Sequence, residues 1–164
     1  MIRQHGARPR PLLTLAGLLL LLIGTVQPAF ATNFVVSKTA DTNDGACNAD
    51  CSLREAITAA NAAGSDDPIT FANGANGTIT LSSALPALAN NGTLTIIGNG
   101  PTNTIVSGNN AVRVFYVNGD ATVTISGMTI ANGKGNFGGG IYRDGGALTV
   151  TNSSFSGNSA TSAG

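Results

Sequence analysis

The side chains best suited to chemistry gather in one stretch, DTNDGACNADCSLREAITAANA, which runs from Asp41 to Ala62. Its first half surrounds Gly45 with oxygen-bearing side chains, those of Asp41, Asn43, Asp44 and Asp50. Oxygen ligands on a turn are typical of calcium sites, but this spacing lacks the alternation of an EF-hand loop and its distal glutamate. The competing interpretation is Asx turns, in which such side chains bond their own backbone. The spacing favours the turns, and calcium stays the weaker hypothesis.

The same stretch holds the whole cysteine content, Cys47 and Cys51. In an exported chain, which the leader described below predicts, such a pair favours a disulfide. The bond would close a small loop, contribute about 2–3 kcal/mol at best, and fix the turn that follows. Free thiols or a redox pair are the alternatives. Two thiols are too few for a soft-metal site, and the single histidine, His5, lies in the leader.

Acid–base chemistry has few candidates in the remainder of the chain. Asp120 and Asp144 are the only acids after Asp67, and the basic residues there are Arg113, Lys134 and Arg143. A polysaccharide-cleaving site needs a base or a carboxylate pair in one groove. Asp120 and Asp144 would form a pair only if one coil of the fold contains about as many residues as separate them. The favoured alternative is that both are turn residues. We predict no catalytic residue. Aromatics for sugar binding are also few, because Tyr116 and Tyr142 are the only tyrosines and tryptophan is absent.

A short helix is the element that must position the first cluster. Ser52 and Glu55 have the spacing of a capping box, and Gly64 is a suitable end. Between them, apolar residues recur at steps of three and four, at Leu53, Ala56, Ile57 and Ala60. A single amphipathic helix of about three turns is not stable alone in water. We expect it to cover the open end of a stacked sheet.

CSLREAI, from Cys51 to Ile57, resembles the CSLREA domain found at the start of exported bacterial beta-helix proteins. The resemblance covers roughly Phe34 to Asn61 and includes the Asp/Asn-rich loop before the motif and the AAN segment after it. It implies an exported beta-helix but no reaction, because that family is known by its sequence rather than by an activity.

Short apolar segments fill the rest of the chain and predict strands. They span residues 33–36, 69–71, 78–81, 94–97, 104–106, 112–117, 122–125, 128–130, 140–142 and 148–151. Several alternate apolar with hydroxylated residues, which gives each strand one apolar face. The segments follow one another too closely to leave room for crossover helices.

The tract also repeats. TVTISGMTIANG, from Thr122, aligns with ALTVTNSSFSGN, from Ala147, without a gap, and a looser copy begins at Leu94. This alignment places Val123 on Leu148, Ile125 on Val150 and Ile130 on Phe155. Strands and turns that recur at a fixed offset, here from Thr122 to Ala147, are typical of a solenoid. We predict an all-β fold, a right-handed parallel beta-helix of about four coils with a short N-terminal capping α-helix, in preference to a propeller or sandwich.

Two glycine-rich segments add a second resemblance. Gly145-Gly146-Ala147-Leu148, followed by Phe155-Ser156-Gly157-Asn158, resembles the GGA and FxxN repeats of polymorphic outer-membrane proteins, and Gly138 to Ile141 is similar to a half-copy. Such glycines allow tight corners, and asparagine at corners tolerates the left-handed region and can form ladders between coils.

Residues 1–31 predict a cleavable signal peptide. Arg3, Arg8 and Arg10 precede an apolar run from Leu12 to Ile23, and Ala29-Phe30-Ala31 fits a cleavage site. An uncleaved anchor is the alternative. Cleavage leaves five of the eight basic residues against eight acidic ones, a net charge of −3. This charge argues against nucleic acid as a partner. We therefore divide the chain into a signal peptide (1–31), an N-terminal cap (32–64) and beta-helix repeats (65–164).

These observations predict a secreted or cell-surface protein, extracellular or outer-membrane associated, with a structural or adhesin-like function and no enzymatic activity. Its partners would be glycans, extracellular matrix or other cells, with no cofactor and no transmembrane segment after cleavage. The abrupt end after Asn158 predicts the N-terminal part of a longer protein, or a gene fragment. The alternative is a pectate-lyase-like carbohydrate-active enzyme whose groove lies in further coils.

Overall fold

The computed structural model describes Met1, Asp66 and residues 32–64, 68–89 and 93–162. The predicted signal peptide, apart from Met1, lies outside the described residues. The described chain is a β-solenoid of about three turns with one α-helix before the coils, which confirms the all-β beta-helix with a short helix. The right-handed sense remains the expectation for parallel crossovers.

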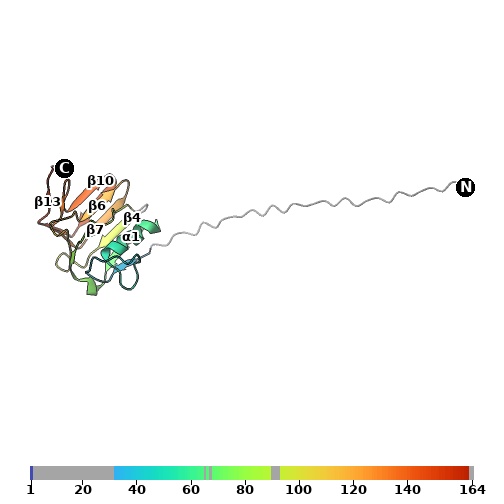
Figure 1. The fold of residues 1–164 in the computed structure, drawn as a ribbon, viewed down its shortest axis with the longest axis horizontal. Helices are drawn as coiled ribbons and strands as arrows, with labels where there is room; N and C mark the ends of the chain where they lie inside the picture. The colour runs from blue at the N-terminus through green and yellow to red at the C-terminus, as the bar shows by residue number, and fades with distance from the viewer. Residues whose placement is uncertain (2–31, 65, 67, 90–92, 163–164) are drawn as a thin grey trace.

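The elements follow one another with short connections (Figure 1). The cap contributes β1 (Phe34–Val36) and α1 (Leu53–Ala63). The coils contribute β2 (Pro68–Phe71), a 3-10 turn η1 (Asn73–Ala75), β3 (Gly77–Thr80), β4 (Thr93–Ile97), β5 (Thr104–Ser107), β6 (Phe115–Asn118), β7 (Thr122–Ser126), β8 (Thr129–Ala131), β9 (Lys134–Gly135), β10 (Ile141–Asp144), β11 (Ala147–Thr151), β12 (Ser154–Ser156) and β13 (Ser159–Ala160).

Every strand pair in the described chain is parallel. The largest sheet has the order β1-β2-β4-β7-β11, and a second has the order β12-β8-β5-β3. Two smaller sheets pair β10 with β6 and β13 with β9. Strands of successive coils therefore stack on one another, as a solenoid requires and as the hairpins of a propeller or sandwich do not.

The register confirms the predicted repeat. Val123 pairs with Leu148, Ile125 with Val150, and Ile130 with Phe155. The looser copy at Leu94 also pairs with Val123. More residues separate Leu94 from Val123 than separate Val123 from Leu148, so the number of residues per coil is not constant. A period taken from the last two coils alone therefore overestimates the number of coils. The predicted four coils are corrected to about three.

Strand boundaries differ from the prediction where the local pattern was weak. The strand expected from Val112 begins at Phe115, because the Ala111 and Val112 amides both donate to the Gly108 carbonyl in a turn. The short strands β9, β12 and β13 were not predicted. Strands β9 and β13 have two residues each and no large apolar side chain, so only pairing with a neighbouring coil identifies them. Strand β12 has a single apolar residue, Phe155, which the repeat had aligned with Ile130 without predicting a strand there.

The core lies inside the coils and consists of stacked aliphatic side chains. Ile69, Leu94, Ile96 and Ile125 are fully buried. Corners that bring backbones close need glycine: Gly146 has φ 62°, and a Cβ there would lie 2.2 Å from the Ala121 carbonyl oxygen. The predicted glycine corner at Gly145 and Gly146 is therefore present.

Helix α1 covers the first end of the solenoid. Its apolar residues Leu53, Ala56, Ile57 and Ala60 are buried, as the periodicity predicted. They pack against β1 and β2, and Gly64 ends the helix in the left-handed region with φ 65°. In Figure 1 the helix lies at the blue-green end of the molecule, and the orange and red strands form the other end.

Candidate functional site

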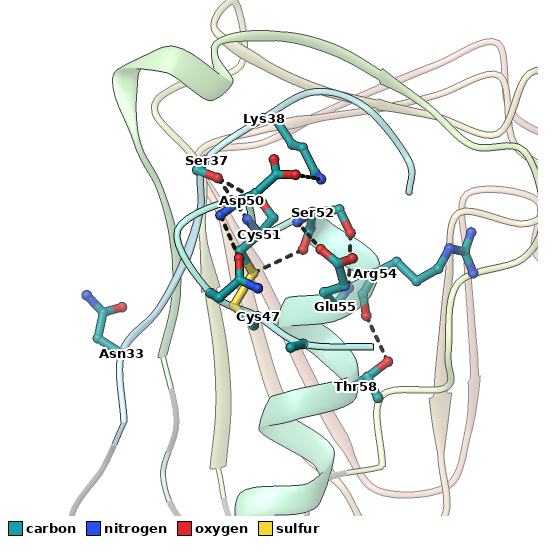
Figure 2. Close-up of a disulfide and its surroundings, with 12 residues drawn as sticks. Asn33, Ser37, Lys38, Cys47, Asp50, Cys51, Ser52, Arg54, Glu55 and Thr58 are labelled. Carbon is teal, nitrogen blue, oxygen red and sulfur yellow. Dashed lines mark hydrogen bonds and ion pairs between the residues drawn. A yellow bond between two sulfur atoms is a disulfide. The ribbon is translucent and has the colours of Figure 1, made fainter. Parts of the chain in front are cut away.

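The predicted capping box is present at the start of α1 (Figure 2). The Glu55 amide donates to the Ser52 hydroxyl at 3.2 Å, and the Ser52 amide donates to the Glu55 carboxylate at 2.7 Å. The other Glu55 oxygen accepts from the Asp44 amide at 2.7 Å. Burial raises the pKa of Glu55, but these hydrogen bonds outweigh it and hold the pKa below its usual value. Glu55 therefore joins the helix to the preceding loop as a carboxylate.

Arg54 points to the other side of the helix start (Figure 2). Its hydrogen bonds hold the cap on the first coil. Its guanidinium donates two hydrogen bonds of 2.9 Å to the Asp41 carboxylate, and others to the Ser83 and Ala84 carbonyls. Asp41 also accepts from the amide and hydroxyl of Ser82. Burial raises the pKa of Asp41, but the bonds from Arg54 and Ser82 hold it below its usual value.

Asn61 adds a second clamp further along α1. Its amide nitrogen donates to the Ala87 carbonyl at 2.7 Å, and its oxygen accepts from the Ala89 amide at 3.2 Å. The polar residues Ser52, Arg54, Glu55 and Asn61 of the CSLREA-like stretch thus bond backbone or ion-pair partners. These hydrogen bonds hold the stretch to the first coil and to the preceding loop.

Cys47 and Cys51 form the predicted disulfide. Ser37 fixes the second cysteine, because its hydroxyl accepts from the Cys51 amide at 2.9 Å and its own amide donates to the Cys51 carbonyl. Beside the bond, Lys38 and Asp50 form an ion pair of 2.9 Å. Neither free thiols nor a redox-exposed pair is needed to explain these two residues, since Cys51 is buried.

The four calcium candidates do not converge. Asp41 faces Arg54, and Asp50 faces Lys38. The Asn43 oxygen accepts from the Gly45 amide and the Asp44 oxygen from the Ala46 amide, which are the Asx turns favoured from the sequence. Within the described residues, no group of three or more His, Cys, Asp or Glu side chains is placed to hold a metal ion.

The carboxylates Asp120 and Asp144 are not brought into register. Asp144 pairs with Asn118, because the step from β6 to β10 is longer than the separation of the two acids. Asp120 lies in the exposed turn that follows β6. Asp144, interpreted from the sequence as a turn residue, lies instead in β10 together with Arg143, whose guanidinium donates to the Gly145 and Gly146 carbonyls. A paired-carboxylate site on this face is therefore not formed by these two residues.

The register that separates these acids stacks the two tyrosines. Tyr116 pairs with Tyr142, and their rings lie 5.6 Å apart with an interplanar angle of 13°. Phe137, which precedes β10, lies 6.0 Å from the Tyr142 ring and is 44% exposed. Such separations are those of favourable aromatic pairs. Three of the eight aromatic residues of the chain meet on the outer surface of the β6–β10 sheet.

Arg113 completes this aromatic cluster. Its guanidinium lies 4.8 Å from the centroid of the Tyr142 ring and 5.6 Å from that of Tyr116. The same group donates to the Phe137 and Gly138 carbonyls, which fixes it against the rings. A cation held over aromatic rings in this way is stabilised by their quadrupoles. We call Arg113, Tyr116, Phe137 and Tyr142 the aromatic cluster.

A row of oxygen-bearing side chains runs beside the aromatic cluster. Asn118 and Asp144 pair across the same two strands and are exposed. The single hydroxyl proton of Tyr116 is shared between the two, with its oxygen 3.2 Å from the Asn118 Oδ1 and 3.3 Å from the Asp144 Oδ2. Partial burial raises the pKa of Tyr116, and the adjacent Asp144 carboxylate raises it further, so the phenol stays a donor. Within the described residues, the Tyr142 hydroxyl, the Asn118 amide nitrogen and one Asp144 oxygen form no hydrogen bond.

Sequence reasoning missed this cluster, although a signal was present. The separation of the two tyrosines is close to the repeat period, and side chains one period apart on a solenoid stack. Their small number argued against a sugar-binding surface when they were considered one at a time. Arg113 and Phe137 carried no signal, because both lie at turns whose path depends on the coil above.

Comparison with known protein families, with curated proteins and with solved structures finds no match to this chain. Among the described residues, no helix has both the length and the apolar character needed to cross a membrane.

Proposed function

We propose that this protein is a secreted or cell-surface β-solenoid with a structural and adhesive function and no enzymatic activity. Its lateral faces contact glycans, extracellular matrix or other cells. The single observation that carries the adhesive part is the aromatic cluster, which is rigid, outward-facing and unused by the packing of the core. Tyrosine and arginine are the residue types that dominate binding energy at protein surfaces.

Export is supported by the signal-like residues 1–31 and by the disulfide, which persists in oxidising compartments. The resemblance of Cys51 to Ile57 to the CSLREA domain supports the same location. In this proposal, the cap seals one end of the solenoid with α1 and the disulfide, so that the coils can extend as a stiff body outside the cell.

A rigid body suits adhesion because a preorganised surface loses little conformational entropy on binding. The aromatic cluster lies on paired strands, and Arg113 is tied to two backbone carbonyls. The carbohydrate-cleaving alternative gains no support from this face, since the register separates Asp120 from Asp144.

Two measurements test the proposal. The N-terminal sequence of protein secreted by a bacterial host should begin at Thr32. Beads coated with residues 32–164 should adhere to cultured cells, to immobilised glycans or to matrix proteins above the level of beads coated with the reduced, heat-unfolded chain. Adhesion equal to that of the unfolded control on all three surfaces would refute the adhesive function.

A further inference from the structure

We propose that the outer face of the β6–β10 sheet binds a neutral or weakly charged polysaccharide that runs along the solenoid axis. This inference rests on the proposed adhesive function and names the class of ligand. The binding face consists of the aromatic cluster and the adjacent pair Asn118 and Asp144.

The binding face is periodic along the solenoid axis. Tyr142 repeats Tyr116 and Asp144 repeats Asn118, each displaced by one strand of a parallel pair, or about 4.8 Å along the axis. A surface that repeats by translation best matches a ligand that also repeats by translation. A linear polysaccharide is such a polymer, whereas a folded protein surface generally is not.

The side chains of the binding face match the chemistry of a sugar. A sugar ring presents apolar C–H surface together with hydroxyls that both donate and accept. The exposed Phe137 ring offers apolar contact, the stacked tyrosine rings add their edges, and a tyrosine hydroxyl offers a polar tip. Asn118 can donate and accept, and Asp144 can accept. Each of these two side chains keeps a free polar atom within the described structure, as does the Tyr142 hydroxyl.

The charges near the binding face disfavour a strongly anionic ligand. The Arg113 guanidinium is engaged by two carbonyls and two rings, and Arg143 donates to backbone carbonyls. Asp144 and Asp120 add negative charge nearby. The mature chain has a net charge of −3, so a strongly anionic polymer would be repelled at long range. A neutral or weakly charged chain of hydroxyls fits these groups best.

The size of the face argues against a protein partner. Stable protein interfaces bury about 800 Å² on each side around an apolar centre. Here the aromatic row ends at Tyr116, because the bridge between Leu88 and Val117 places Ala87 at the next position along the axis. Neighbouring outward residues of the large sheet, such as Thr122 and Thr149, are hydroxylated.

The test is affinity electrophoresis of residues 32–164 in gels that contain a neutral β-glucan, a galactomannan or polygalacturonate, followed by titration with oligosaccharides of the polymer that retards it most. Wild-type protein should be retarded by at least one neutral polymer, and longer oligosaccharides should bind more tightly than the monosaccharide. Tyr142→Ala and Phe137→Ala should each weaken binding about tenfold or more.

Two further variants keep the test specific. Phe155→Ala removes an exposed aromatic ring that lies on a different sheet, and it should bind like the wild type. Tyr142→Phe keeps the ring and the fold but removes the free hydroxyl, and it should bind with intermediate affinity. Thermal unfolding of each variant is measured, and binding is compared at a temperature at which all of them are folded, so that unfolding cannot imitate loss of binding.

No retardation by any polysaccharide would overturn the inference, and so would equal binding by wild type and the Tyr142 and Phe137 variants. A third outcome separates this inference from the proposed function. If coated beads adhere to matrix protein, and the variants of the aromatic cluster lose that adhesion while added polysaccharide has no effect, the ligand is a protein. The carbohydrate assignment is then wrong, and the adhesive function stands.

Discussion

The last two coils of the described chain carry the same kind of apolar pattern, yet they bury it very differently. Ile130 is fully buried, whereas Phe155, its register partner in the last coil, is 55% exposed. Val123 is 1% exposed, and its partner Leu148 is only partly buried. Side-chain alternation therefore decides which way a residue points, but the coil above decides whether it is buried.

Polar groups at the two ends differ in the same way. At the cap, the Asp41 side chain is 3% exposed and the Arg54 side chain 12%, and each has several partners. At the other end, Arg143 is exposed and donates only to nearby turn carbonyls. Buried polar groups at the cap need protein partners, whereas the exposed polar groups of the last coil can form hydrogen bonds with water. Stability should therefore be far more sensitive to change at the cap.

The largest difference is expected between Ile57→Ala and Phe155→Ala. Ile57 is fully buried on the inner face of α1, so its truncation leaves a cavity and should lower the free energy of unfolding by about 2–5 kcal/mol. Phe155→Ala truncates an exposed side chain and should lower the free energy of unfolding by less than about 1 kcal/mol. Urea unfolding of residues 32–164 measures both. Equal losses would contradict the idea that the last coil is less buried than the cap.

The second comparison replaces an arginine at each end. Arg54→Met should cost about 3 kcal/mol, because it leaves the Asp41 carboxylate buried with Ser82 as its remaining partner. Arg143→Met should change the free energy of unfolding by less than about 0.5 kcal/mol. The double variant Arg54→Met with Asp41→Leu serves as a control. It should recover part of the loss if the unpaired charge, rather than lost packing, is the cause.

Reduction of the disulfide should have a smaller effect, about 2 kcal/mol, because the loop it closes is short. Thermal unfolding with and without reductant measures it, and the double variant Cys47→Ser with Cys51→Ser serves as the control that reductant cannot affect. A melt that is unchanged by reduction would show that Ser37 and Glu55 hold the turn without the covalent bond.

The smallest effect is expected from acid. The pKa values of Asp41 and Glu55 are lower in the folded chain than their ordinary values of 3.8 and 4.5, so the unfolded chain binds protons first. Their contribution is complete above about pH 5 and is lost progressively as the pH falls through the folded-state pKa values. The urea concentration at the midpoint of unfolding should therefore decrease when the pH is lowered below about 4. Glu55→Gln should be less stable at neutral pH but show a shallower acid slope, and an unchanged slope would contradict this assignment.

Sequence alone determined the features that depend on short-range geometry. The capping box follows from the positions of Ser52 and Glu55, the disulfide from two closely spaced cysteines, and the glycine corner from Gly145 and Gly146. The repeat that aligns β7 with β11 also predicted the pairing of the last two coils, because the turns that follow these strands have equal length.

Tertiary structure alone decided which distant residues meet. The step between coils varies with the length of each corner, since it is longer from Leu94 to Val123 than from Ile69 to Ile96. A small change in this step separates Asp144 from Asp120 and places Tyr142 on Tyr116. The clamp between Arg54 and Asp41 likewise depends on how the cap lies on the first coil. Local spacing fixes the direction of each side chain, but its neighbours depend on the register, which only the packed coils set.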